Sequence, residues 1–112
     1  MLEYSIYDFK ASRELIIHVG ENAKDNFRLI DISNRYDIWL HLKNYPSPHV
    51  VIHNNKKEIS SETLFYAAEL CKDHSKYHCT ENLEIIYTKI KDIEKTETIG
   101  SVIIKNERFI SL

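Results

Sequence analysis

The stretch that decides the fold runs from residue 37 to residue 53 and reads Asp37-Ile-Trp-Leu-His-Leu-Lys-Asn-Tyr-Pro-Ser-Pro-His-Val-Val-Ile-His53. Two short runs of alternating character, residues 38–42 and 49–53, flank a segment that contains two prolines. Because proline fixes φ and lacks a backbone N–H, this middle segment continues neither run. The pattern predicts two neighbouring β-strands joined by a loop.

Side chains alternate between the two faces of a strand, so each run divides into two sets. Ile38, Leu40 and Leu42 share one face of the first strand, and Val50 and Ile52 share one face of the second. The two apolar sets align only in registers that bring residue 42 near 50, or 41 near 49, because a slip of one residue turns the histidines inward. We expect the apolar sets to face the core.

The other side chains of this hairpin are expected to cluster on the outward face: Trp39, His41, His49 and His53, with Asp37 at the edge. One interpretation is structural, in which the indole packs under a neighbouring element and the histidines bond loop backbone. A second is a binding face, in which the indole or an imidazole stacks on a base or on a partner side chain. Cross-strand imidazoles can also bind a metal, but no ligand spacing supports a metal site. Catalysis has the least support, since no nucleophile–base arrangement or phosphate-cradling glycine loop is present, and we expect neither enzyme activity nor a cofactor.

The rest of the chain supplies the partners of the hairpin. Gly20 is followed by Asn22, a suitable helix N-cap, with Asp25 at the third position. Leu64, with residues 67, 68 and 71, marks one buried face of a second helix that Ser60 or Ser61 can cap. The expected strands are residues 4–9, 14–19, 38–42, 49–53, 83–90, 102–105 and 108–111, the last two as a closing hairpin, and the second helix spans 61–76. The predicted fold class is α+β: a curved, mainly antiparallel sheet, in the order ββαββαβββ, with two helices packed on it.

Composition sets limits on the functional class. The chain has 112 residues, of which 43% are hydrophobic, so we expect one domain over residues 1–112. The formal net charge of −2 counts against a strong nucleic-acid binder, and any basic footprint must be local. Cys71 and Cys79 lie eight positions apart, which is neither a metal-binding pair nor a disulfide framework. The absence of an apolar run of about 20 residues and of a signal-like N-terminus predicts a cytoplasmic protein.

Several short motifs occur together in a defined order. They are Gly20-Glu-Asn-Ala-Lys-Asp-Asn26, Asp37-Ile-Trp-Leu-His41, Pro46-Ser-Pro-His-Val50, Ala67-Ala68 with Ser75-Lys76, Tyr87-Thr88 followed by Lys91, and Gly100-Ser-Val102. In this combination the chain resembles the NFACT-R domain family over nearly its whole length. It departs from the family pattern where Pro46-Ser-Pro48 replaces Pro-Gly-Ser and where His78 stands in place of a basic residue.

The resemblance implies a non-catalytic RNA-binding module of the kind found in the ribosome quality-control factors NEMF and RqcH, and this chain is expected to be a stand-alone form. Its expected partners are tRNA, ribosomal RNA or a ribosome-associated protein. The alternative is a protein-interaction adaptor that uses the same Trp/His face. The residues expected to contact RNA or a partner are Asp37, Trp39, His41, His49, His53, Ser75, Lys76, Tyr87 and Lys91. The residues expected to shape the motifs are Gly20, Asn22, Asn26, Pro46 and Gly100.

Eight lysines are candidate phosphate contacts, and about half of them can share a face. They are Lys43, Lys56, Lys57, Lys72, Lys76, Lys89, Lys91 and Lys95. Acidic residues interleave with the last of these. With about three or four phosphate contacts, RNA binding is expected to be weak and sensitive to salt.

Overall fold

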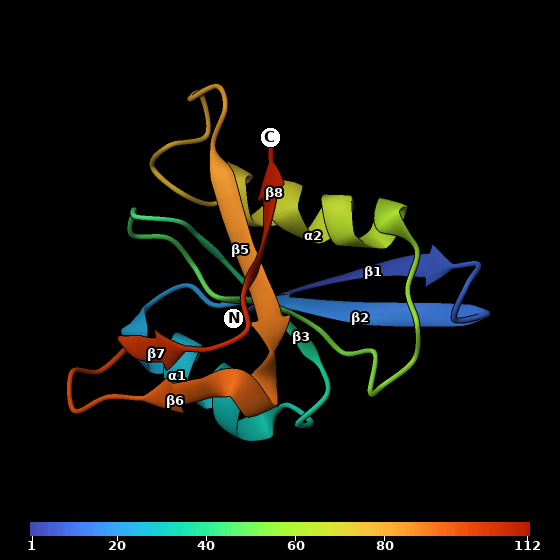
Figure 1. The fold of residues 1–112 in the computed structure, drawn as a ribbon, viewed down its shortest axis with the longest axis horizontal. Coiled ribbons are helices and arrows are strands. Elements are labelled where there is room, and N and C mark those ends of the chain that lie inside the picture. Colours follow the sequence, from blue (N-terminus) through green and yellow to red (C-terminus); the bar gives the residue numbers. More distant parts are fainter.

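The computed structural model describes residues 1–112 as a six-stranded sheet, a two-stranded sheet and two α-helices (Figure 1). In chain order the elements are β1 (Leu2–Asp8), β2 (Arg13–Val19), α1 (Ala23–Ile32), β3 (Ile38–Leu42), β4 (Val50–Ile52), α2 (Ser61–Asp73), β5 (Glu84–Lys89), a 3-10 turn (Ile90–Asp92), β6 (Ile93–Lys95), β7 (Val102–Ile104) and β8 (Arg108–Ser111). Every strand pair is antiparallel, and the predicted α+β class is confirmed. Neither helix has the length and hydropathy that a membrane crossing requires.

The large sheet has the strand order β1-β2-β4-β3-β5-β8. Helix α1 joins β2 to β3 across β4, and α2 joins β4 to β5 across β3. Figure 1 shows the two helices on opposite sides of the sheet, with α1 next to the β6–β7 hairpin. Both faces of the central strands are therefore covered.

The main core lies between α2 and the sheet. Ala67, Ala68 and Cys71 of α2 are fully buried against the aliphatic set of the central strands, which includes Leu40 and Val50. The small alanine side chains let the helix axis approach the sheet closely. The pairs Leu40↔Val50 and Ile38↔Ile52 continue to a register with residue 41 near 49, one of the two that the sequence allows. The prediction that the aliphatic sets face the core is confirmed.

A second, smaller core lies on the other face of the sheet, and it overturns one expectation. It consists of Leu29 of α1 with Trp39, Val51, Ile86 and Ile90. The Trp39 side chain is 0% exposed, so the expected outward face around it is wrong. The alternation assigned the indole to the correct side of β3, but α1 and the β6–β7 hairpin cover that side.

The end of the chain also pairs differently from the expected closing hairpin. Strand β7 pairs with β6, which the sequence did not predict, while β8 returns to the large sheet beside β5. Between them Asn106 adopts a left-handed φ of 56°, so the chain does turn where expected. Two hydrogen bonds fix the segment by which the chain crosses from β7 to β8. Lys105 N donates to Asp92 O at 3.0 Å, and Thr88 Oγ1 donates to Lys105 O at 2.9 Å. These contacts are non-local, and strand alternation does not reveal them.

Candidate nucleic-acid interface

Three aromatic rings of the predicted site form a closed cluster in the second core. The His41 ring lies parallel to Trp39, at 7° and 5.6 Å between centroids, and His49 meets Trp39 edge-on at 5.2 Å. His49 is 1% exposed, and the half-buried His41 has its Nδ1 2.6 Å from Leu42 O. The indole therefore offers no surface on which a base can stack, and the structural interpretation of Trp39 holds.

The two histidines of this cluster are neutral at physiological pH. Burial, aided by the neighbouring His41, lowers the pKa of His49 to about 3 against a smaller opposing effect of the Gly100 backbone. Burial also lowers the pKa of His41, partly opposed by the Leu42 backbone. A neutral imidazole carries no charge to attract phosphate, so these two rings add nothing to an electrostatic RNA footprint.

Asp37 and His53 are joined to each other rather than to solvent. The buried Asp37 carboxylate accepts from Asn34 N at 2.9 Å and Asn55 N at 2.8 Å, and it lies 3.0 Å from His53 Nδ1. Burial alone raises the pKa of Asp37, but the hydrogen bonds from His53 and the two backbone groups outweigh it and lower that pKa. Asp37 thus holds together the loop before β3 and the turn after β4.

Four of the motif segments converge on one cleft of about 610 Å³, which we call the motif cleft. Its walls come from residues 19–23 with Asn26, from 46–48, from 74–76 and from 99–101. The predicted motif residues Gly20, Asn22, Asn26, Pro46 and Gly100 all line it, as do Ser75 and Lys76. Glu21 and Lys76 offset each other, so this cleft has little net charge.

The motif residues of the cleft hold one another in place. Asn22 caps α1 by accepting from Asp25 N at 2.8 Å, as predicted. Asn26 Oδ1 accepts from His49 N at 3.1 Å, and it lies so close to Gly20 that a Cβ there would overlap it. Gly100 has a φ of 86° and approaches α1 at Ala23, where a Cβ would lie 2.9 Å from the alanine Cβ. These residues therefore have structural roles at the cleft.

The opposite end of the large sheet carries a row of exposed cations, which we call the basic end. Strands β1, β4 and β5 end on this side of the sheet, and β2, β3 and β8 begin there. Each cation lies at or next to one of these strand ends. The residues of the basic end are Arg13, Arg35, Lys56, Lys57, Lys89, Lys91 and Arg108. Six strands spaced about 4.8 Å apart give this row a span of roughly 24 Å.

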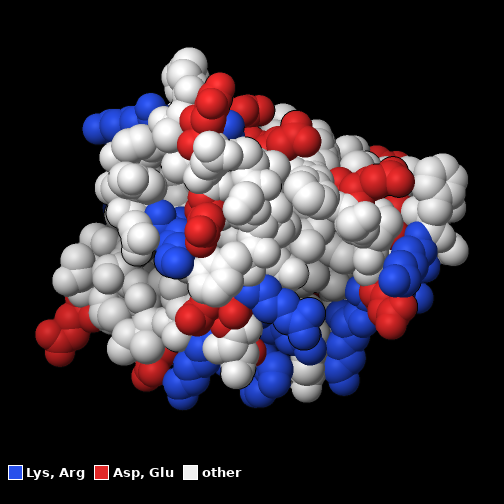
Figure 2. Space-filling model, turned by 45° about the horizontal axis from the view of Figure 1, so that its top comes forward, with Lys and Arg blue, Asp and Glu red and all other residues white.

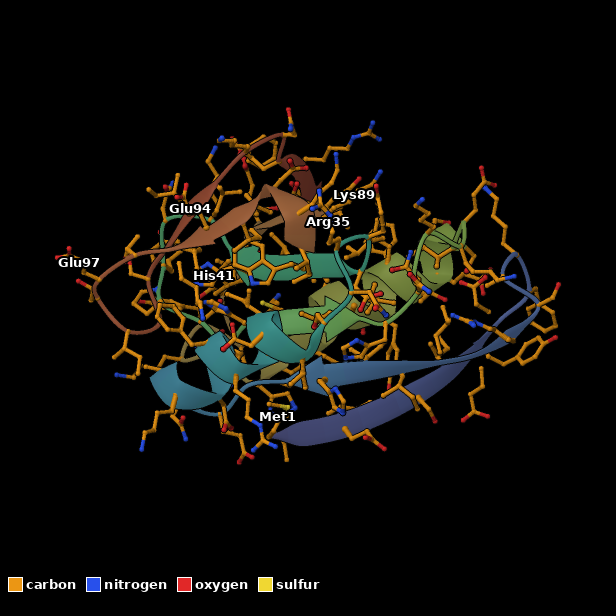
Figure 3. All side chains as sticks on the ribbon, turned by 90° about the horizontal axis from the view of Figure 1, so that it is seen from below. Met1, Arg35, His41, Lys89, Glu94 and Glu97 are labelled. Carbon is orange, nitrogen blue, oxygen red and sulfur yellow. The ribbon has the colours of Figure 1, made fainter.

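Part of the basic end is organised around Tyr36 and the backbone before β3. Lys56 Nζ lies 4.2 Å from the centre of the Tyr36 ring and Lys89 Nζ 5.8 Å from it, while Lys91 N donates to Arg35 O at 2.8 Å. Two hollows of about 510 and 410 Å³ adjoin there and share Ile38 and Lys89. Figure 3 places Arg35 close to Lys89 and away from the acidic residues labelled on the β6–β7 hairpin.

Ion pairing distinguishes the basic end from two of the other candidate lysines, Lys43 and Lys95. None of its seven cations forms an ion pair, whereas Lys43 pairs with Glu84 at 3.3 Å and Lys95 pairs with Asp31 at 2.6 Å. Glu58 and Asp92 are the acids that line the two hollows. Figure 2 shows the resulting band of basic side chains along the lower rim of the molecule, with most acids above it.

The structure separates the predicted site residues into four places, one of which is the Asp37–His53 pair described above. Trp39, His41 and His49 lie in the second core, Ser75 and Lys76 lie at the motif cleft, and Tyr87 and Lys91 line the basic end. Lys56, Lys57, Lys89 and Lys91 are the four candidate lysines that gather together. Sequence reasoning missed Arg13, Arg35, Arg108 and Tyr36. Their common signal is position: each lies within a few residues of the same end of its strand.

Comparison with known proteins agrees with this fold. Residues 5–106 match the family described as the NFACT protein RNA binding domain. The Rqc2 homolog RqcH of Bacillus subtilis is 33% identical over 88 residues, which cover 78% of this chain and 15% of that protein. A coiled-coil domain-containing protein 25 homolog of Dictyostelium discoideum is 30% identical over 102 residues, covering 85% of this chain and 50% of that protein.

A solved structure gives the same result in three dimensions. The C-terminal part of the fibronectin/fibrinogen-binding protein from Streptococcus suis superposes with a TM-score of 0.82 at 28% identity, over 88% of this chain and 41% of that one. The chain thus spans half or less of the length of each of these relatives. The family match covers most of its residues, and four of the motif segments quoted from the sequence meet at the motif cleft. This chain belongs to the NFACT protein RNA binding domain family.

Proposed function

We propose that this chain is a non-catalytic RNA-binding module that contacts tRNA, ribosomal RNA or ribosome-associated complexes through the basic end, and that residues 1–112 act as a single domain. The observation that carries the proposal is the row of seven exposed cations without ion pairs, in a chain whose family is described as RNA-binding. Contact between surface cations that lack an ion pair and RNA phosphates favours binding, because it releases the counterions condensed on the RNA. A role in ribosome quality control, and with it a cytoplasmic location, is suggested by the RqcH relative.

The geometry of the basic end fits a phosphate backbone better than a small ligand. It has two separate hollows that share a wall at Ile38 and Lys89, rather than one enclosed pocket. A row that runs across the ends of successive strands can meet several successive phosphates. Because the net charge of the whole chain is −2, the attraction is local, and binding is expected to be weak and sensitive to salt.

Fluorescence anisotropy with tRNA at low salt tests this proposal. The wild-type protein is expected to bind with a log Kd that rises linearly with log salt, and the double variant Lys56→Ala/Lys57→Ala is expected to bind roughly tenfold more weakly and to lower the slope by about 1.4. The control is Lys24→Ala/Arg28→Ala, which removes the same charge from the exposed side of α1. Equal losses of tRNA affinity in the two double variants would indicate that only total charge matters. That result would reject the basic end as the RNA-binding surface.

A protein-interaction adaptor remains the second candidate, and one observation favours it. The motif cleft is larger than either hollow of the basic end, and it carries little net charge. This location replaces the Trp/His face, which is buried. Recovery of the same protein partners before and after RNase treatment, lost on Lys76→Glu, would support this candidate.

A further inference from the structure

The tip of the β1–β2 hairpin presents two aromatic side chains to solvent. Phe9 is 82% exposed, the most among the large hydrophobic residues, and Tyr7 is 52% exposed. Their rings meet edge-on with centroids 5.0 Å apart. No element of the chain covers them, so this pair is not part of either core.

The exposed tip is held firmly. One oxygen of the buried Asp8 carboxylate accepts from Lys10 N and Ala11 N, both at 2.8 Å. Its other oxygen accepts from Ser60 N at 2.8 Å, from Ser60 Oγ at 3.1 Å and from Thr63 Oγ1 at 2.6 Å at the start of α2. Five hydrogen bonds to one carboxylate fix the turn on either side of Phe9, so its ring is displayed by a rigid support.

The tip also touches the basic end. Arg13 Nη2 donates to Asn54 O at 3.4 Å, and Lys10 Nζ lies 3.7 Å from Glu58 at the exposed surface. The turn that contains these partners carries Lys56 and Lys57. The aromatic pair therefore lies next to the cation row, at the β1–β2 end of that row.

A row of cations that leads to an exposed aromatic ring is the arrangement by which proteins hold single strands. The cations follow the phosphates, and the ring takes a base that is free of a Watson–Crick partner. A base inside a duplex is stacked on both faces and has no free face to offer. Neither neutral peptides nor duplex nucleic acid explain why the ring and the cations are adjacent.

Resting on the proposed function, we infer that the tip residues Phe9 and Tyr7 are a stacking platform for an unpaired base, and that the basic end takes RNA with a single-stranded segment in preference to a blunt duplex. Phe9 supplies the open ring face, and Tyr7 supports it from the edge. Arg13 and Lys57, which form no ion pair, are the nearest cations of the basic end along the chain and can contact the neighbouring phosphates. The ligand class is therefore single-stranded RNA or an RNA loop.

The test compares a fluorescein-labelled U12 oligonucleotide with a blunt 12-base-pair RNA duplex by anisotropy at low salt. Phe9→Ala is expected to weaken binding of the single strand roughly tenfold and to leave duplex binding within twofold of the wild type. Phe9→Trp keeps an aromatic ring at this position and is expected to bind the single strand about as tightly as the wild type. The control is Phe109→Ala, which removes a Phe of 51% exposure from β8 at the opposite edge of the sheet and is expected to change neither affinity.

A spectroscopic readout accompanies the affinities. In Phe9→Trp, stacking of a uracil on the new indole is expected to quench its emission, whereas the buried Trp39 does not respond. If the wild type binds U12 and Phe9→Ala leaves that affinity unchanged, or lowers both affinities equally, the stacking inference is overturned while the proposed function stands. If the wild type binds neither RNA, the proposed function fails and takes this inference with it.

Discussion

Trp39 is the largest fully buried side chain of the protein, and it anchors the smaller of the two cores. Its ring fills the space between β3, α1 and the β6–β7 hairpin. Trp39→Ala is expected to destabilise the fold by about 3–5 kcal/mol, measured by urea unfolding, because the cavity cannot collapse against three rigid elements. Phe65→Ala, at a 44% exposed position on α2, is expected to stay within about 0.5 kcal/mol. A loss under 1 kcal/mol in Trp39→Ala would contradict the burial described above.

His49 gives the second prediction at the residue scale, and its sign follows from its depressed pKa. The unfolded chain takes up a proton near pH 6.5, whereas native His49 resists protonation until about pH 3. The contribution of His49 to folding stability is therefore greatest above pH 6.5 and falls as the pH is lowered toward 3, by up to about 1.4 kcal/mol per pH unit. NMR of the imidazole is expected to show His49 neutral at pH 5. A charged ring at that pH would mean that His49 is open to solvent.

At this scale the sequence identified which side chains share a face, but not which face is open. Strand alternation places Trp39 with His41 and His49, and the rings do lie together. Exposure depends on which side of the sheet each helix crosses, and that is a property of connections between strands. The expectation about the indole failed because both faces of β3 are covered.

At the scale of elements, the hairpin β1–β2 is joined to α2 through Asp8. Burial alone would raise the pKa of Asp8, but hydrogen bonds from Thr63, Ala11 and Ser60 lower it to about 2. The stabilisation is present above the unfolded pKa of about 3.9 and is lost as the pH falls toward 2. Asp8→Ala is expected to cost about 2 kcal/mol and to speed hydrogen exchange at Lys10 N and Ala11 N. Unchanged exchange at those two amides would show that Asp8 does not hold the turn.

The junction of β2, α1 and β4 supplies a prediction of coupling. A Cβ at Gly20 would overlap Asn26 Oδ1, which accepts the backbone hydrogen bond from His49. Gly20→Ala and Asn26→Ala are each expected to cost about 2 kcal/mol. The double variant is expected to cost less than the sum by at least about 0.5 kcal/mol, because removing the amide makes room for the new methyl group. Additive losses in thermal unfolding would show that the two residues act independently.

Local signals identified most elements because their causes are local. The cap at Asn22, the cap at Ser60 and the strand of residues 38–42 are each encoded within a few positions and were confirmed. The partners of β7 and β8 were not, because Asp92 and Thr88, which fix the crossing, lie more than ten residues away from it. A polar turn in the sequence predicts that the chain reverses direction. It does not predict which strand the chain pairs with next.

At the scale of the whole molecule, the two ends of the sheet differ in character. One end gathers motif residues in a cleft of little net charge, and the other gathers seven unpaired cations beside exposed aromatics. A net charge of −2 hides this separation, because the total averages over all 17 acids, most of which lie elsewhere. The cations approach one another only through the strand order, so no window of the sequence contains the row.

The most direct measurement is an NMR titration of the labelled protein with U12 at low salt, followed by mapping of the amide and indole signals that move. The account predicts the largest shifts at residues 9–10, 35–36, 54–57, 89–91 and 108, with the Trp39 indole signal unmoved. Shifts confined to residues 20–26, 46–48, 74–76 and 99–101 would place the ligand in the motif cleft instead and would contradict the assignment of RNA contact to the basic end.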